Sequence, residues 1–196
     1  MMKVFVGGSR FTTKLNAEVL KRLDNMMEKN FPVIVGDANG ADKAVQQYLH
    51  GKGYQNVEIF CSGRVCRNNI GKWRTRNIAA GAGEKGAQFY SVKDRAMADE
   101  ATIGLMIWDQ ESIGTLLNVY RLIARNKKIV VYLVPEKRFV ELRNASDLDS
   151  LMNGIDDVLR AKFSGRAKLE ESISALLMQS SFFDSDRTGK FANQHR

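Results

Sequence analysis

Short apolar runs alternate with longer stretches of helical periodicity along most of the chain. The apolar runs are continuous, as strands buried on both faces should be, and they occupy residues 3–8, 33–36, 56–63, 103–109 and 128–134. Amphipathic stretches separate them at residues 15–30, 41–53, 92–102 and 113–127. Such alternation is typical of βαβ units. We therefore expect a Rossmann-like, doubly wound α/β fold with a mainly parallel sheet of about five to seven strands.

The alternation breaks in two places. Residues 63–86 have weak periodicity, five glycines and many cations around Trp73. This segment can be a surface loop with one packed tryptophan, a lid over a ligand pocket or a nucleic-acid surface, and a short strand is expected at 87–90. Beyond Pro135 the helical segments at 147–159 and 167–183 predict a C-terminal helical extension. We divide the chain into an α/β domain, 1–135, and an extension, 136–196, that packs on this domain or on a partner subunit in a homodimer.

Composition and charge narrow the classes of function. The 196 residues, 44% of them hydrophobic, suffice for one domain with a proper core. No apolar run reaches the roughly 18 residues of a membrane span, and the N-terminus leads straight into a strand rather than a signal peptide. We expect a cytoplasmic protein without a membrane partner. The net charge of +8 favours anionic partners such as nucleotides or nucleic acids, although it also keeps a protein soluble.

Metal and cofactor chemistry is not predicted. Cys61 and Cys66 do not make a disulfide framework, and we expect a reducing environment for them. His50 and His195 lack ligand spacing to another histidine or cysteine. The sequence contains neither a G-x-S-x-G nor a Walker A pattern.

Small, polar or glycine-rich loops follow four of the predicted strands. The carboxyl ends of parallel strands lie at one edge, where such folds bind ligands. Glycines allow a backbone to approach a phosphate, the next helix offers free N–H groups, and arginines pair with phosphate oxygens. The candidate ligand-binding residues in these loops are Gly7, Gly8, Ser9, Arg10, Gly36, Asp37, Asn39, Gly40, Asp42, Arg64, Ser112, Gly114 and Thr115.

Four short motifs occur in a recognisable order: "GGSR" at 7–10, "GDANGAD" at 36–42, "KDRAM" at 93–97 and "SIGT" at 112–115. Together they resemble the SLOG superfamily of Rossmann-like nucleotide-binding domains, which includes the "lonely guy" phosphoribohydrolases and the DNA-processing protein A family. The resemblance covers residues 3–135. It implies a nucleotide or nucleotide-derived ligand, such as an ADP-ribose-like compound, and adds Arg95 to the site. Asp42 would then hold a ribose hydroxyl, cap the following helix, or do both.

Catalysis is left open by the sequence. The phosphoribohydrolases carry glutamates after a Gly-Thr turn, whereas Thr115 is followed here by two leucines and Asn118. Asn118 can hydrogen-bond a ribose or base but cannot act as a carboxylate nucleophile. Asp109, at the end of a strand, is the best-placed candidate catalytic carboxylate or else a polar strand terminus. The alternatives to a binding module are thus a nucleotide N-glycosidase and a single-stranded nucleic-acid binder.

Overall fold

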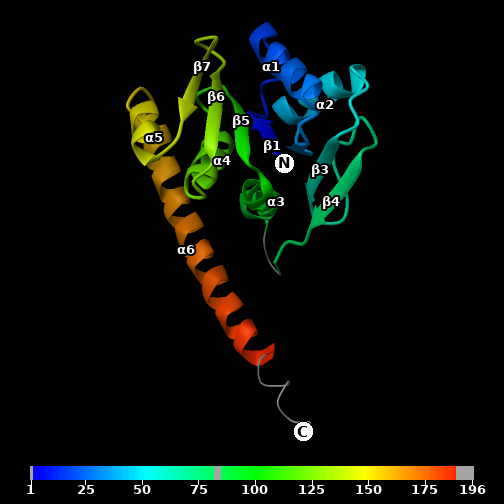
Figure 1. Cartoon of the computed structure of the whole chain (residues 1–196). Coiled ribbons are helices and arrows are strands. Elements are labelled where there is room, and N and C mark those ends of the chain that lie inside the picture. The colour runs from blue at the N-terminus through cyan, green and yellow to red at the C-terminus, as the bar shows by residue number, and fades with distance from the viewer. Residues whose placement is uncertain (1, 82–84, 189–196) are drawn as a thin grey trace. The chain divides into compact units, whose positions relative to one another are not determined.

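The computed structural model describes residues 2–81 and 85–188 and confirms the predicted fold class (Figure 1). The seven-stranded sheet of the described chain has the order β4-β3-β2-β1-β5-β6-β7. The first six strands in this order run parallel, and β7 is antiparallel to β6. The strands are β1 (Val4–Gly8), β2 (Val33–Gly36), β3 (Val57–Ser62), β4 (Arg74–Ile78), β5 (Ile103–Trp108), β6 (Lys128–Leu133) and β7 (Arg138–Leu142).

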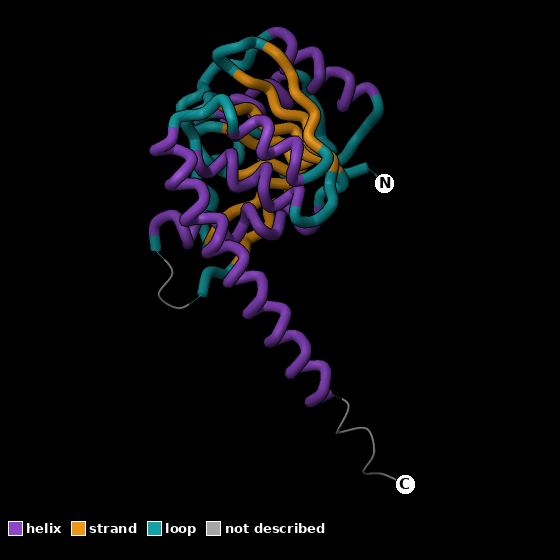
Figure 2. The backbone as a smooth tube through the Cα atoms, turned by 90° about the vertical axis from the view of Figure 1, so that its left-hand side faces the viewer, coloured by secondary structure: helices purple, strands orange, loops and turns teal. Residues whose placement is uncertain are grey.

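Helices cover both faces of the sheet (Figures 1 and 2). Those of the unit that contains the sheet are α1 (Ala17–Glu28), α2 (Ala41–Gly51), α3 (Gly86–Glu100), α4 (Ile113–Ile123) and α5 (Ala145–Met152), and α6 (Asp157–Thr188) belongs to a second unit. Val19 of α1 and Val45 of α2 belong to the same buried cluster as Val6 of β1. The neighbouring Phe5 is also buried, and side chains alternate between the faces of a strand. The central strands therefore need apolar residues at every position, which explains their uninterrupted apolar runs.

Two local predictions differ from the structure. Residues 74–78 form the edge strand β4, whose side chains are exposed or half-buried, so an apolar pattern is missing there. Residues 87–90 were expected to be a strand but lie in the first turns of α3. The expected loop over 63–86 therefore holds a strand, and its residues 82–84 lie outside the described part of the chain.

The first compact unit is longer than the sequence analysis placed it. It extends from Met1 to Ile155, and Asp156–Arg196 forms a second unit. The sheet continues past Pro135 because a turn, in which Lys137 has a φ of +51°, leads into β7 and pairs it with β6. Leu148 and Met152 of α5 are buried within the same unit. The second unit contains α6, which includes the helical segment predicted at 167–183, whereas the segment predicted at 147–159 is divided between α5 and α6.

None of the helices in the described part of the chain is both long enough and apolar enough to cross a lipid bilayer.

Candidate functional site

The strand order reverses its direction between β1 and β5. The chain leaves β1 toward β2 on one side and leaves β5 toward β6 on the other, which makes this the topological switch point of the sheet. Ser9 directly follows β1 and is fully buried. Its hydroxyl accepts a hydrogen bond from the N–H of Asp109 at 3.1 Å and lies 3.3 Å from Oγ1 of Thr115. Thr115 in turn donates to Oγ of Ser112 at 3.2 Å. Four predicted residues thus meet here.

Asp109 has a structural role at this switch point. Its Oδ1 accepts the backbone N–H groups of Glu111 at 3.0 Å and Ser112 at 2.8 Å. These bonds shape the turn that leads into α4. These contacts match the role of a polar residue at the end of a strand, which the sequence analysis considered for Asp109. The catalytic role of Asp109 stays a prediction.

Two predicted glycines are explained by contacts within the chain. A Cβ at Gly8 would lie 2.8 Å from Cβ of Ala41 and would overlap the carbonyl of Ile107. Gly40 has a φ of +77°, and a Cβ there would overlap the backbone of Arg10. These glycines let the loop after β1 lie directly against β5 and the start of α2.

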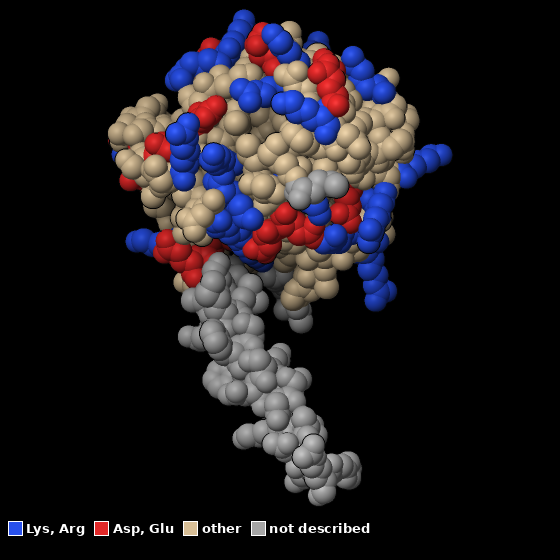
Figure 3. Space-filling view, in the orientation of Figure 1, with Lys and Arg blue, Asp and Glu red and all other residues tan. Residues whose placement is uncertain are grey.

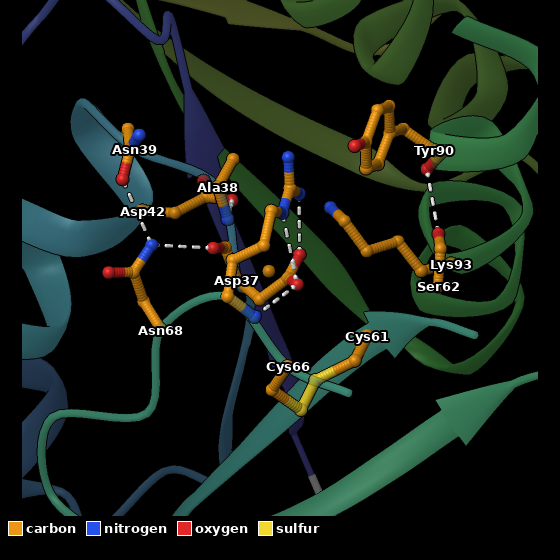
Figure 4. A network of polar contacts seen from close by, with 12 residues as sticks. Asp37, Ala38, Asn39, Asp42, Cys61, Ser62, Cys66, Asn68, Tyr90 and Lys93 are labelled. Atoms are coloured by element: carbon orange, nitrogen blue, oxygen red, sulfur yellow. Dashed lines mark hydrogen bonds and ion pairs between the residues drawn. A yellow bond between two sulfur atoms is a disulfide. The ribbon is translucent and has the colours of Figure 1, made fainter. Parts of the chain in front are cut away.

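A network of charged side chains lies at the end of β2; we call Asp37, Asp42, Arg67, Lys93 and Asp94 the charge network. Asp37, Asp42 and Lys93 are buried, whereas the side chains of Arg67 and Asp94 are 38% and 17% exposed. Asp37 follows β2 and is 1% exposed. Arg67 donates to it three times, from its backbone N–H at 3.0 Å, from Nε at 3.1 Å and from Nη2 at 2.6 Å. Figure 4 shows Asp37 between the loop that follows β3 and Lys93 of α3. The network joins segments that are far apart in sequence.

Asp42 and Lys93 converge on Gly36, the last residue of β2. An added Cβ at Gly36 would overlap Oδ2 of Asp42 and contact Nζ of Lys93. Lys93 donates to Oδ1 of Asp94 at 2.7 Å, and Oδ2 of Asp42 accepts the N–H of Ala38 at 3.2 Å. Gly36 is thus needed so that two charged groups can reach the end of β2.

Burial and charge act against each other in the charge network. Burial alone would raise the pKa of Asp37, but the hydrogen bonds from Arg67 and the charge of Lys93 outweigh it, so that its pKa is lowered. Burial raises the pKa of Asp42 to about 6, although the charge of Lys93 opposes this shift. Burial would lower the pKa of Lys93, but the charges of Asp94 and Asp42 outweigh the effect of burial, so that the pKa of Lys93 is raised. Asp37 and Lys93 are therefore ionised at neutral pH, whereas Asp42 titrates close to it.

A second group of polar contacts extends the network toward α4. Arg121 is 2% exposed, donates to Oδ1 of Asn118 at 2.6 Å and lies 3.7 Å from Oδ2 of Asp94. Asn118, a predicted ligand residue, is 8% exposed. Asn118 therefore lies near the predicted site, but its side-chain oxygen already accepts a hydrogen bond from Arg121.

The remaining predicted residues differ in their exposure and in their contacts. Arg10 and Arg64 are exposed, and Gly7 is buried within β1 while Gly114 is exposed in the first turn of α4. Asn39 accepts from Nδ2 of Asn68 at 3.1 Å. Arg95 is 9% exposed and donates to Ser91 in its own helix.

Sequence reasoning missed Arg67, Lys93 and Arg121. Lys93 and Asp94 open the "KDRAM" motif, from which only the arginine was selected. Arg67 lies in the cationic segment after β3, and its position in sequence did not identify its partner. Buried acids at the end of β2 were the available signal, since buried charges require partners.

Cys61 and Cys66 form a disulfide, with their Cα atoms 5.2 Å apart. The sequence analysis did not expect a bridge, because two cysteines are too few for a framework. The pairing depends on the turn after β3, which brings the two residues together.

The cationic segment before β4 is anchored to the sheet and α2. Trp73 is 6% exposed and donates from Nε1 to the carbonyl of Tyr54 at 2.9 Å. Gln46 of α2 accepts the N–H of Ile70 at 3.0 Å and donates to the carbonyl of Gly36 at 2.9 Å. These contacts agree with a surface segment that contains one packed tryptophan. On the face shown in Figure 3, Lys and Arg are interspersed with Asp and Glu.

Two surface cavities lie on other parts of the first unit. One, of about 750 Å³, is lined by the ends of α1 and α2, including Asp24, Lys52 and Tyr54. The other, of about 410 Å³, lies along α1 with Phe31, Ile103 and Phe139 in its wall. Among the described residues, His, Cys, Asp and Glu side chains do not gather in any group of three or more suited to a metal ion.

Comparisons with family models, curated proteins and solved structures gave no match.

Proposed function

We propose that this chain binds a nucleotide or nucleotide-derived small molecule, such as an ADP-ribose-like compound or a nucleoside phosphate, at the carboxyl edge of its sheet. The observation that carries the proposal is the chain of hydroxyls Ser9, Thr115 and Ser112 at the switch point, beside the first turn of α4. Hydroxyls and free N–H groups at a helix start are suited to phosphate oxygens. The motif resemblance supports the same edge.

The charged residues suggest how the ligand would be oriented. A phosphate beside Thr115 would be near the positive end of the α4 dipole. The exposed Arg10 and Arg64 follow β1 and β3, so their guanidinium groups can pair with phosphate oxygens at this edge. The charge network supplies a rigid, largely satisfied wall in which Asp37 is held by Arg67.

Calorimetry with ADP-ribose, a nucleoside monophosphate and the corresponding free nucleoside tests the proposal. Thr115→Val removes one hydroxyl at nearly constant shape, and Arg10→Ala and Arg64→Ala remove one cation each. Each change should weaken binding of the phosphorylated ligands by roughly 1.5–3 kcal/mol, as expected for a hydrogen bond to a charged group. Thr75→Val, on the exposed edge strand β4, is the matched control and should bind normally.

Equal losses for the free nucleoside would contradict a phosphate role for these residues. Absence of binding by all three compounds to the wild-type protein would contradict the proposed function itself.

The glycosidase alternative depends on Asp109. Oδ1 of this residue already accepts two N–H groups, and no carboxylate follows Thr115 in the next three positions. We therefore propose binding without turnover. Release of free base or ribose phosphate from nucleoside monophosphates, abolished by Asp109→Asn, would favour the enzyme instead. Strong, salt-dependent retention of single-stranded oligonucleotides would favour the nucleic-acid alternative.

A further inference from the structure

The disulfide lies directly beside the charge network. Cys61 is near the end of β3 and is fully buried, whereas Cys66 is half-buried in the loop that follows. Arg64 and Val65 between them are exposed, and Val65 is 80% exposed. Figure 4 shows the bridge next to Asp37. A reductant in solution can therefore approach this loop, and of the two sulfurs it can reach that of Cys66 more easily.

The bridge fixes the backbone that supplies the donors to Asp37. Arg67 follows Cys66 directly and donates to Asp37 from both its backbone and its guanidinium group. The next residue, Asn68, donates from Nδ2 to the carbonyl of Asp37 at 2.8 Å and to Oδ1 of Asn39 at 3.1 Å. One covalent bond to β3 thus positions two consecutive residues that hold the loop after β2.

The start of α3 is connected to the same place. The ring of Tyr90 lies 4.2 Å from the guanidinium carbon of Arg67, a cation–π contact. The carbonyl of Tyr90 accepts a hydrogen bond from Oγ of Ser62, the residue after Cys61, at 3.4 Å. Lys93 lies one turn further along α3 and faces Gly36. Movement of the bridged loop would therefore affect three parts of the candidate site: the loop after β2 with Asp37, the bridged loop itself with Arg67, and the start of α3 with Lys93.

We propose that the Cys61–Cys66 pair is a thiol–disulfide exchange site through which a dithiol reductant controls ligand binding at the carboxyl edge of the sheet. A thiolate of the reductant attacks Sγ of Cys66, which breaks the Cys61–Cys66 bond and forms a mixed disulfide. The second thiolate of the reductant then displaces Cys66. The reductant leaves as a cyclic disulfide, two electrons and two protons have passed to the protein, and both cysteines are thiols.

Reduction removes the covalent restraint on the loop that carries Arg67. This residue and Asn68 then leave Asp37 more often, because only hydrogen bonds and packing hold them. The ligand part of the proposal rests on the function proposed above. The reduced protein should bind a phosphorylated ligand about tenfold more weakly, which corresponds to about 1.4 kcal/mol.

Amide hydrogen exchange measured by NMR on the full chain tests the restraint without a ligand. The Arg67 amide is the direct reporter, because this N–H donates to Asp37. After reduction with dithiothreitol it should exchange at least tenfold faster, while amides in the centre of β1 and β5 should keep their rates. An unchanged rate for the Arg67 amide would overturn the proposal.

Two variants control this experiment. Val65→Ser changes an exposed residue of the bridged loop, keeps both cysteines and should retain the response to dithiothreitol. The double variant Cys61→Ala, Cys66→Ser should exchange like the reduced wild-type protein and show no response. If the double variant does not fold, Cys66→Ser alone serves the same purpose. Protein whose two cysteines are alkylated without reductant, even after treatment with oxidised glutathione, would refute the bridge.

Calorimetry with ADP-ribose tests the coupling to the ligand site. The tenfold weaker binding should appear on reduction of the wild-type protein and not of the double variant. Equal affinity in both states, together with faster exchange of the Arg67 amide, would overturn the control of binding by the bridge. If ADP-ribose and a nucleoside monophosphate bind in neither state, the proposed function fails, and the ligand part of this proposal fails with it. The exchange measurement would still decide the restraint.

Discussion

Gly40 shows how a residue chosen for its place in a ligand loop is used for packing. Its φ of +77° is unfavourable for other residues, and an added Cβ would overlap the backbone of Arg10. Gly40→Ala should lower the free energy of unfolding by roughly 2–5 kcal/mol, from the left-handed backbone and the overlap together. Chemical denaturation measures this loss.

Gly53→Ala is the matched control for Gly40→Ala. Gly53 has a similar φ of +70°, but an added Cβ would have no neighbour within 4 Å. The control should lose only about 1–2 kcal/mol, the cost of the backbone conformation alone. Similar losses for the two variants would show that the contact with Arg10 is unimportant.

Asp42 should make stability depend on pH in an unusual direction. Its folded pKa of about 6 is above its ordinary value of 3.8, so between these values the folded protein holds a proton that the unfolded chain releases. The free energy of unfolding contributed by this group therefore falls as pH rises through this window. The total loss is on the order of 3 kcal/mol, from about two pKa units at 1.36 kcal/mol each.

Asp42→Asn removes this titration. Urea unfolding at pH 4, 5, 6 and 7 should show the variant gaining stability relative to the wild-type protein as the pH rises. Asp37, whose lowered pKa acts in the opposite direction at lower pH, is present in both proteins and largely cancels in the difference. Asp149→Asn, on an exposed position of α5, controls for general charge effects. A difference that stays constant with pH would contradict a buried, titrating Asp42.

At the scale of elements, the start of α4 depends on Asp109. Asp109→Ala removes the oxygen that accepts two N–H groups of the turn before α4 and should cost about 0.5–1.5 kcal/mol of stability for each lost hydrogen bond. Asp109→Asn keeps an acceptor at Oδ1 and should be closer to wild type. It should also leave nucleotide affinity within about tenfold, roughly 1.4 kcal/mol. Thermal and chemical unfolding compare the two variants, and equal destabilisation by Ala and Asn would argue against a role of Asp109 in this turn.

The elements also show which patterns the sequence could reveal. The central strands and α1, α2 and α4 were predicted because burial on one or both faces imposes an apolar pattern. The edge strands β4 and β7 were missed because their exposed side chains, several of them charged, carry no such pattern. Charged residues are common on edge strands, where they prevent pairing with other chains.

At the scale of the whole molecule, the first compact unit should fold by itself. It contains the complete sheet and α1–α5, and it ends at Ile155. A chain that stops after residue 155 should unfold in one cooperative transition, whereas a chain that stops after residue 135 should be strongly destabilised because β6 loses its partner β7. Circular dichroism melts of both chains measure this difference.

The chain that stops after residue 155 also tests the homodimer that the sequence analysis considered. If the extension provides a subunit contact, light scattering should give a dimer for the full chain and a monomer for residues 1–155. If the truncated protein has the same oligomeric state as the full chain, any subunit contact lies outside the extension.

The sequence by itself determined the fold class, the central strands and the edge at which polar loops gather, because these follow from local apolar periodicity and from the geometry of parallel strands. It also selected Ser9, Ser112 and Thr115, which the structure brings together. Only the tertiary structure decided the partners. Arg67 meets Asp37 and Lys93 meets Asp42 because the sheet order places the ends of β2 and β3 beside α3. Charges far apart in sequence leave no periodic signal, and the same holds for the turn that pairs Cys61 with Cys66.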